Sequence, residues 1–438
     1  MRGTSPAGVY RVRVPTPARP LIRRVAAATG AIALDSWLLV AGPASAAPTC
    51  VFDEVGGAVT IAVGEGETAV IGVANGAITL NGTPCDAAMV TTTDSITVDA
   101  TGTPTGVDID IGGGEFVPGL TAEADGMPEI EFTLNLPNGS PVVRVVGGAN
   151  ADNLLYGTGG INLNGAESTA DADVTIAGAP LVVLDGNGGD DVLSLAGGAG
   201  TGEPASGTLN GGGENDLLFG GGLGGATFDG GSGTDVVDYA AASQLVLANL
   251  ATGVVNHAGG QSDALSTLEN LTGSPGADAI TGDDEPNVLQ AGAGDDLVIG
   301  GGGDDTLGGG EGLDTVAFGT VEGGVRVDLR DGTSEGDGND VLADFENVVG
   351  TSQADTIHTD HGRSIVIGGR GSDELYGHDG ADALRGDQGN DQLFGQKGTD
   401  LVSGGPGRDQ LDGGQAQDRC RGGPDPDAFV FCEVIRLN

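Results

Sequence analysis

A nine-residue period constrains this chain more than any other feature of its sequence. From Gly350 to Val430 the sequence divides into consecutive nonapeptides without an insertion, and a second uninterrupted run covers residues 273–317. The pattern is Gly-Gly-x-Gly-x-Asp-x-apolar-x, and isolated copies occur earlier at 186–194, 211–219 and 230–238. A fixed period of this kind predicts a repeat fold, in which each unit buries its apolar residue against its neighbours.

The order of residues within the repeat predicts a short strand and a tight turn. The last three positions alternate outward, inward and outward, as a three-residue strand requires. The first six positions form the turn, where glycine allows positive φ and close approach of the backbone. Two nonapeptides then make one coil of 18 residues, so that residue i stacks on residue i+18, as Asp373 does on Asp391.

Stacked aspartates require a cation. Like charges about 5 Å apart repel each other, and a divalent cation between them reverses the sign of the interaction. Calcium suits this turn better than magnesium because it takes six to eight carboxylate and carbonyl oxygens in flexible geometry. The predicted metal ligands are the carboxylates at the sixth position of the repeats: Asp191, Asp216, Asp235, Asp278, Asp296, Asp305, Asp314, Asp355, Asp373, Asp382, Asp391, Asp400, Asp409, Asp418 and Asp427. Ser364 and Asn287 replace the carboxylate in two repeats, where weak or empty sites are expected.

The repeats resemble those of the RTX family, the hemolysin-type calcium-binding nonapeptide repeats. GGRGSDELY at 368–376, GGSGTDVVD at 230–238 and GGGGDDTLG at 300–308 match the family motif at every defined position. The resemblance implies an all-β fold, a right-handed parallel β-roll, with several calcium ions held between successive turns. It also implies that the aspartates named above and nearby glycine carbonyls are the ligands.

The composition agrees with a cation-dependent fold. The 438-residue chain has 85 glycines, and its 63 acidic and 17 basic residues give a formal net charge of −46. Such a charge repels nucleic acid and anionic membranes and attracts cations. Low hydrophobicity combined with high net charge predicts a chain that stays unfolded until its charge is neutralised.

The N-terminus resembles a secretory signal peptide. Six arginines precede an apolar stretch from Val25 to Val40, and small residues follow at AGPASAAP. Cleavage after residue 46 leaves 11 basic and 62 acidic residues and no further membrane span. An extracellular protein is expected, either free or associated with the cell surface, and the export route stays open between the general and the twin-arginine pathways. In that compartment Cys50 with Cys85, and Cys420 with Cys432, form two close pairs that predict disulfides near the two ends of the mature chain.

The predicted organisation has eight segments. They are a signal peptide at 1–46, an N-terminal β domain at 47–146, a degenerate repeat block at 147–238, a strand insertion at 239–272, a repeat block at 273–317, a second strand insertion at 318–349, a repeat block at 350–430 and a C-terminal cap at 431–438. The two insertions resemble each other, and each ends in Glu-Asn. The N-terminal region consists of short alternating strands, which form either an irregular β domain or the start of the same solenoid.

No catalytic motif stands out, and we predict that the protein is not an enzyme. The chain has no His-Glu-x-x-His sequence, and the GTSEG sequence around Ser334 lacks the helix that must follow a nucleophile elbow. Asp108 and Asp110 alternate onto one solvent face of a strand. Two alternatives to a calcium-folded secreted protein remain open: a cell-surface or surface-layer adhesive protein that binds cell-surface or extracellular matrix components, and an extracellular enzyme acting on polysaccharides.

Overall fold

The structure is a computed structural model. It describes residues 47–113, 130–137, 141–157, 160–163, 173–178, 180–196, 206–221, 224–336 and 338–436. The predicted signal peptide at 1–46 lies outside these ranges. The described residues form strands and turns and contain no helix. They therefore include no helix that could cross a membrane.

The strands belong to two sheets. The first sheet contains β1 (Thr49–Asp53), β2 (Ala58–Val63), β6 (Ser95–Ala100), β8 (Glu131–Asn135), β10 (Asn153–Gly157), β11 (Gly160–Asn162), β12 (Val174–Ala177), β14 (Val192–Ser194), β16 (Leu217–Phe219), β18 (Val236–Asp238), β22 (Asn270–Thr272), β24 (Val288–Ala293), β26 (Thr306–Glu311), β28 (Arg326–Asp328), β29 (Thr333–Glu335), β30 (Asn339–Ala343), β32 (Thr356–His358), β34 (Glu374–Tyr376), β36 (Gln392–Phe394), β38 (Gln410–Asp412) and β40 (Ala428–Val430). The second sheet contains β3 (Thr68–Ala74), β4 (Ala77–Leu80), β5 (Thr83–Met89), β7 (Gly106–Asp110), β9 (Val142–Val146), β13 (Leu181–Asp185), β15 (Thr208–Gly213), β17 (Thr227–Ser232), β19 (Val246–Asn249), β20 (Val254–His257), β21 (Ser262–Ser266), β23 (Ala279–Thr281), β25 (Leu297–Ile299), β27 (Thr315–Ala317), β31 (Asn347–Val349), β33 (Ile365–Arg370), β35 (Ala383–Gln388), β37 (Leu401–Ser403), β39 (Arg419–Arg421) and β41 (Val434–Arg436).

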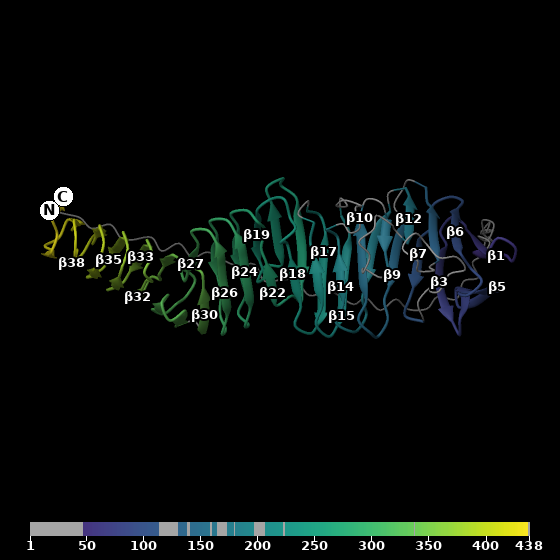
Figure 1. The fold of residues 1–438 in the computed structure, drawn as a ribbon, viewed down its shortest axis with the longest axis horizontal. Helices are drawn as coiled ribbons and strands as arrows, with labels where there is room; N and C mark the ends of the chain where they lie inside the picture. Colours follow the sequence, from purple (N-terminus) through teal and green to yellow (C-terminus); the bar gives the residue numbers. More distant parts are fainter. Residues whose placement is uncertain are drawn as a thin grey trace, which may run out of the picture. The chain divides into compact units, whose positions relative to one another are not determined.

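Most neighbouring strands pair in parallel, with the register that the nonapeptide predicts. In the last block each strand of the first sheet pairs with the strand 18 residues later, so that Ile357 lies beside Leu375 and Leu375 beside Leu393. The second sheet repeats this shift, with Val366 beside Leu384. The strands therefore follow one another in chain order along the molecule (Figure 1). This arrangement confirms the predicted all-β parallel roll.

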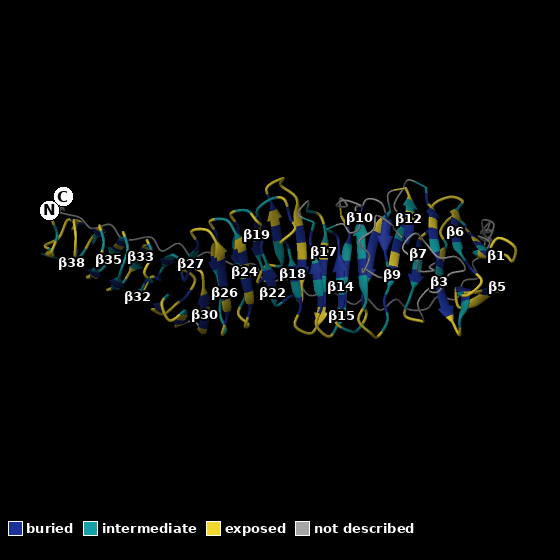
Figure 2. Ribbon diagram, viewed as in Figure 1, coloured by how far each residue is buried: buried dark blue, intermediate teal, exposed yellow. Residues whose placement is uncertain are grey.

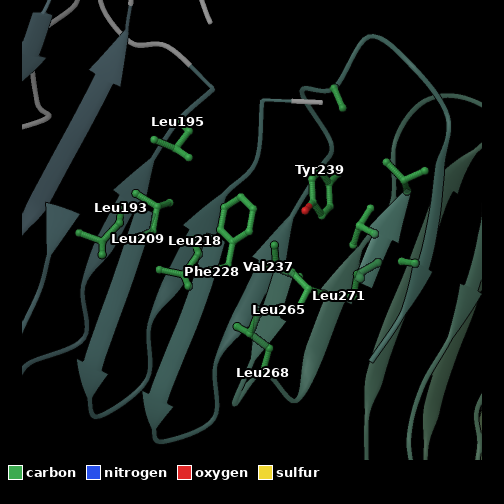
Figure 3. Close-up of a cluster of buried hydrophobic side chains, with 14 of the residues drawn as sticks. Leu193, Leu195, Leu209, Leu218, Phe228, Val237, Tyr239, Leu265, Leu268 and Leu271 are labelled. Atoms are coloured by element: carbon green, nitrogen blue, oxygen red, sulfur yellow. The ribbon is translucent and has the colours of Figure 1, made fainter. Parts of the chain in front are cut away.

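In the nonapeptide repeats the core is a column one side chain wide between the two sheets, whereas strands nearer the N-terminus, such as β2 and β6, bury two or three side chains each. The eighth residue of nearly every repeat is buried, and in strands such as those of Leu375, Leu393 and Val402 its neighbours are exposed or half-buried. Phe429, in the last repeat, is half-buried. Buried and exposed residues therefore alternate along the strands (Figure 2). In the middle of the chain larger residues, Phe228 and Tyr239 among them, fill the space between the sheets (Figure 3).

Residues 47–146 supply the first strands of these same two sheets. β2, β6 and β8 pair in parallel in the first sheet, and β3, β7 and β9 pair in parallel in the second. At the outer edges β1 lies antiparallel to β2, and β4 lies antiparallel to both β3 and β5. The Cys50–Cys85 disulfide joins β1 to β5, and the Cys420–Cys432 disulfide joins β39 to the residues after β40.

Each predicted insertion is a three-stranded zigzag inside one sheet. At 239–272, β19, β20 and β21 pair antiparallel, while β21 pairs in parallel with the preceding β17 and β19 with the following β23. At 318–349, β28, β29 and β30 do the same between β26 and β32, but in the first sheet. The opposite sheet continues without interruption in both places, through β18–β22 and β27–β31. A third zigzag, β10–β11–β12, was not predicted from the sequence.

Some glycines are required because the coils stack with almost no space between their turns. Gly398 has φ +144°, and a Cβ placed there would lie 1.4 Å from the carbonyl oxygen of Gly380 in the preceding coil. Gly319 lies in a turn where a Cβ would meet nothing within 4 Å. Gly398 is therefore required for the coils to stack, whereas Gly319 is not.

We therefore predict that Gly398→Ala destabilises the calcium-loaded protein and that Gly319→Ala does not. The Gly398 substitution overpacks the turn, which costs about 1–3 kcal/mol, and it strains the backbone as well. Urea unfolding followed by circular dichroism measures the difference. Equal free energies of unfolding for the two variants would contradict the close stacking described above.

Candidate calcium sites

A hydrogen bond from backbone to carboxylate joins each coil to the next. The aspartate at the sixth position precedes the strand, and its Oδ1 accepts the backbone N–H of the residue 18 positions earlier. Asp373 N donates to Asp391 Oδ1 over 3.0 Å, and Asp391 N donates to Asp409 Oδ1 over the same distance. Asp382, Asp400 and Asp418, which precede strands of the second sheet, form a second such ladder.

The second carboxylate oxygen of most of these aspartates is buried without a partner. Oδ2 makes no hydrogen bond in Asp191, Asp216, Asp235, Asp296, Asp314, Asp373, Asp382, Asp391, Asp400, Asp409 and Asp418. A buried carboxylate oxygen without a partner is strongly unfavourable, because desolvation is not compensated. A charge buried in this way normally coordinates a metal or pairs with a cation.

The first residue of the repeat, glycine in most copies, lies directly against the orphaned oxygen. A Cβ on Gly395 would lie 2.5 Å from Asp400 Oδ2 and 2.6 Å from the carbonyl oxygen of Gly413 in the next coil. Gly186 and Gly211 show the same pair of neighbours, a carboxylate Oδ2 and a glycine carbonyl oxygen. In these copies a carboxylate oxygen and a carbonyl oxygen therefore lie close to the same glycine, where any larger residue would clash with both.

This set of donors fits calcium. Across the part of the chain that the structure describes, no group of three or more His, Cys, Asp and Glu side chains could hold a metal ion. Backbone carbonyls must supply the remaining ligands, and calcium accepts such mixed oxygen sets in flexible geometry. The residues that would hold it are the eleven orphaned aspartates and the glycine carbonyls beside them.

Comparison with known families supports this interpretation. A family model of the RTX calcium-binding nonapeptide repeat matches the chain in four copies, at residues 201–222, 281–316, 362–393 and 394–428. The chain contains RTX repeats. No curated protein matches it. The matched segments include most of the orphaned aspartates, whereas Asp191, Asp235, Asp278 and Asp355 lie outside them.

In the first repeat after each insertion, the repeat's own residues donate hydrogen bonds to both oxygens of its aspartate. Asp278 accepts hydrogen bonds from Ser274 N at 2.5 Å and Ser274 Oγ at 2.8 Å, so that both of its oxygens have protein partners. Asp355 is held in the same way by Thr351 N and Oγ1. Sequence reasoning treated both aspartates as ordinary ligands. The signal that distinguishes them is Ser or Thr at the second position, where the other repeats have Gly, Asn, Asp, His or Gln.

Asp427, in the last repeat, also has partners for both oxygens. Its Oδ2 accepts Gly423 N and its Oδ1 accepts Asp409 N. Asp305 accepts Asn287 N through Oδ1, and its Oδ2 is not among the orphaned oxygens. Asp278, Asp305, Asp355 and Asp427 therefore differ from the other eleven predicted ligands.

The two repeats that lack the carboxylate behave differently from each other. Ser364 N donates to Asp382 Oδ1, so the backbone ladder continues, but the buried Ser364 Oγ has no partner. Asn287 instead satisfies its own amide, accepting Asp283 N and donating to the Glu269 carbonyl. The expectation of weak or empty sites at these two positions stays a prediction.

Glutamate ends three of the aspartate ladders. Glu269, Glu346 and Glu433 accept the backbone N–H of Asp235, Asp314 and Asp418 through Oε2. The asparagine after each of the first two accepts the N–H of a residue 18 positions later, Val288 for Asn270 and Ile365 for Asn347. The Glu-Asn pair noted in the sequence is therefore the point where an insertion rejoins the regular stack.

Inside the insertions, side chains contact the carboxylate oxygen that is left without a partner in most repeats. Asp263 accepts Ala226 N through Oδ1, as a repeat aspartate does, but its Oδ2 contacts His257 Nε2 at 2.7 Å and Tyr239 Oη at 3.0 Å. Asp340 likewise accepts Asp305 N through Oδ1, and Ser334 Oγ donates to its Oδ2. Sequence reasoning missed both aspartates, which lie outside the nonapeptide pattern.

Ser334, the residue at the centre of the GTSEG sequence, is a strand residue and is not followed by a helix. It lies in β29, is 2 % exposed, and bonds the buried Asp340. Asp108 and Asp110 share one half-buried face of β7, as the alternation predicted. Burial raises the pKa of Asp108 despite the nearby positive charge of Arg144.

Burial also raises the pKa of the eleven orphaned aspartates, and the neighbouring carboxylates raise it further. The pKa rises to about 7 in Asp191, Asp373 and Asp382. It rises to about 6 in Asp216, Asp296 and Asp409. The hydrogen bond from the neighbouring backbone N–H lowers the pKa of each group but does not outweigh burial.

These shifts predict that the calcium-free protein is more stable at pH 5 than at pH 8. A raised pKa means that the folded state binds protons more tightly than the unfolded chain, so the folded state loses stability as pH rises through about 6–7. Far-UV circular dichroism of the calcium-free chain at the two pH values measures this, and more β structure is expected at pH 5. Calcium-loaded protein is the control and has the opposite trend in stability, because protons compete with the metal for carboxylates. A calcium-free chain with more β structure at pH 8 than at pH 5 would contradict the assignment.

Proposed function

We propose that this is an exported calcium-binding β-roll protein, and that calcium drives its folding outside the cell. The observation that carries the proposal is the row of buried Oδ2 atoms without partners beside glycine carbonyl oxygens. RTX repeats supply the family context, since the matching model describes calcium-binding repeats. When bound, calcium would neutralise the stacked carboxylates and complete their coordination.

Calcium binding would supply the free energy that the narrow core lacks. A column one residue wide buries little apolar surface, while ordering each glycine-rich turn costs about 1–2 kcal/mol of backbone entropy per residue. Ions that bind only the folded chain stabilise it by mass action. We place the transition at about 10⁻⁴–10⁻³ M calcium, the range of extracellular calcium modules. The chain would then stay unfolded during export.

Two features support an extracellular location. The first 46 residues resemble a signal peptide, and both cysteine pairs form disulfides in the structure. Disulfides form and persist in oxidising compartments. We infer a binding or structural role rather than catalysis, because Ser334 is buried against Asp340 and presents no accessible nucleophile.

A calcium titration of the chain from residue 47, followed by far-UV circular dichroism, tests the folding step. We expect a cooperative change from coil to β structure with calcium and none with magnesium, which gives up its water reluctantly and demands tight octahedral geometry. A β spectrum in chelator that calcium leaves unchanged would refute calcium-driven folding.

Two matched variants test the ligand assignment. Asp391→Asn replaces an orphaned Oδ2 and keeps an acceptor for Asp373 N, so the number of bound calcium ions should fall. Asp355→Asn changes a carboxylate already held by Thr351, so it should destabilise the fold without changing the calcium content. Bound calcium per chain is measured by equilibrium dialysis. Equal calcium loss in both variants would contradict the distinction between orphaned and internally bonded aspartates.

A further inference from the structure

Two histidines on adjacent coils face each other on the outer surface of the last repeat block. His358 ends β32, and His378 follows β34. His358 Nδ1 lies 3.1 Å from His378 Nε2. His378 has φ +64°, an uncommon conformation for a residue other than glycine, and its ring stacks at 5.4 Å from that of His358. The two nitrogens therefore lie within hydrogen-bonding distance of one another on neighbouring coils.

The surroundings hold this pair in place. The His358 ring stacks on Tyr376 with centroids 4.3 Å apart and planes 4° apart, and Tyr376 stacks in turn on Phe394 at 4.8 Å. These residues are register neighbours in the first sheet. His378 also hydrogen-bonds the side chain of Gln396. Both histidines are half-buried, so a ligand can reach them from solvent.

We propose that His358 and His378 form a binding site for a divalent transition-metal ion of the imidazole-binding class, Cu²⁺ or Zn²⁺. Two nitrogens bound 2.0–2.1 Å from one tetrahedral ion lie about 3.3 Å apart, close to the separation present here. A hydrogen bond to a metal-binding histidine helps to fix the orientation of its ring, and the Gln396 side chain makes one to His378.

The site differs in chemistry from the aspartate ladders. Nitrogen ligands select transition metals, while calcium prefers oxygen. Asp328 lies beside His358 in the sheet but is already paired with Arg330 at 2.8 Å. In the described ranges no cluster of three metal-binding side chains occurs, so water would complete the coordination. One of the two rings donates a proton in the hydrogen bond between His358 Nδ1 and His378 Nε2. When a metal binds, that ring can carry the proton on its second nitrogen instead, so no proton has to be released.

Calorimetric titration of the calcium-saturated chain from residue 47 with Cu²⁺ and with Zn²⁺ tests the proposal. We expect one ion to bind, with Cu²⁺ tighter than Zn²⁺. His358→Ala and His378→Ala should each weaken binding at least tenfold. His361→Ala is the control, since this exposed histidine forms a 3.5 Å ion pair with Asp379 and is not one of the two facing nitrogens. Circular dichroism in calcium shows whether each variant keeps the fold.

Tyrosine fluorescence supplies a second readout that does not depend on the histidine variants. Cu²⁺ bound at His358 would quench the stacked Tyr376, so Tyr376→Phe should lose the quenching and retain the binding. The proposal is overturned if His358→Ala and His378→Ala bind Cu²⁺ as tightly as the unmodified chain, or if only His361→Ala weakens binding. Since calcium saturates the protein throughout, failure here would leave the calcium proposal untouched.

Discussion

The hydrogen bond between a backbone N–H and the carboxylate of the next coil sets the geometry of this molecule. Each such bond orients the carboxylate so that Oδ1 faces the backbone of one coil and Oδ2 faces the glycine turn. The stacking of coils and the demand for a cation are therefore two results of one interaction. The same bond explains why the sixth position of the repeat is aspartate, whose short side chain reaches one coil and no further.

The irregular parts of the chain preserve this interaction while changing what satisfies the second oxygen. Ser274 and Thr351 bond the carboxylate from within the first repeat of a block, and His257 does so within an insertion. At these positions a hydrogen bond from the protein satisfies the carboxylate oxygen that would otherwise need an ion. The chain thus combines coils that depend on calcium with coils that are satisfied internally, and the latter lie where the regular period is broken.

The sequence was sufficient to predict the regular half of the structure. The spacing of nine predicted the 18-residue register, the single inward residue and the parallel stack, because each depends only on the repeat itself. It did not predict that each insertion folds into an antiparallel zigzag, nor that the two zigzags lie in different sheets. That pairing depends on which strand edges remain free where the regular coil is interrupted. Nor did the sequence separate Asp355 from Asp373, because the difference lies in a hydrogen bond from Thr351 rather than in the motif.

The most direct measurement is a crystal structure of the calcium-loaded protein with the anomalous signal of calcium recorded. The account predicts calcium peaks beside the orphaned Oδ2 atoms, such as those of Asp373, Asp391 and Asp400, with glycine carbonyls among the ligands. It predicts no peak at Asp263 or Asp355, whose oxygens already have protein partners. Peaks at all aspartates alike, or none beside the orphaned oxygens, would contradict it.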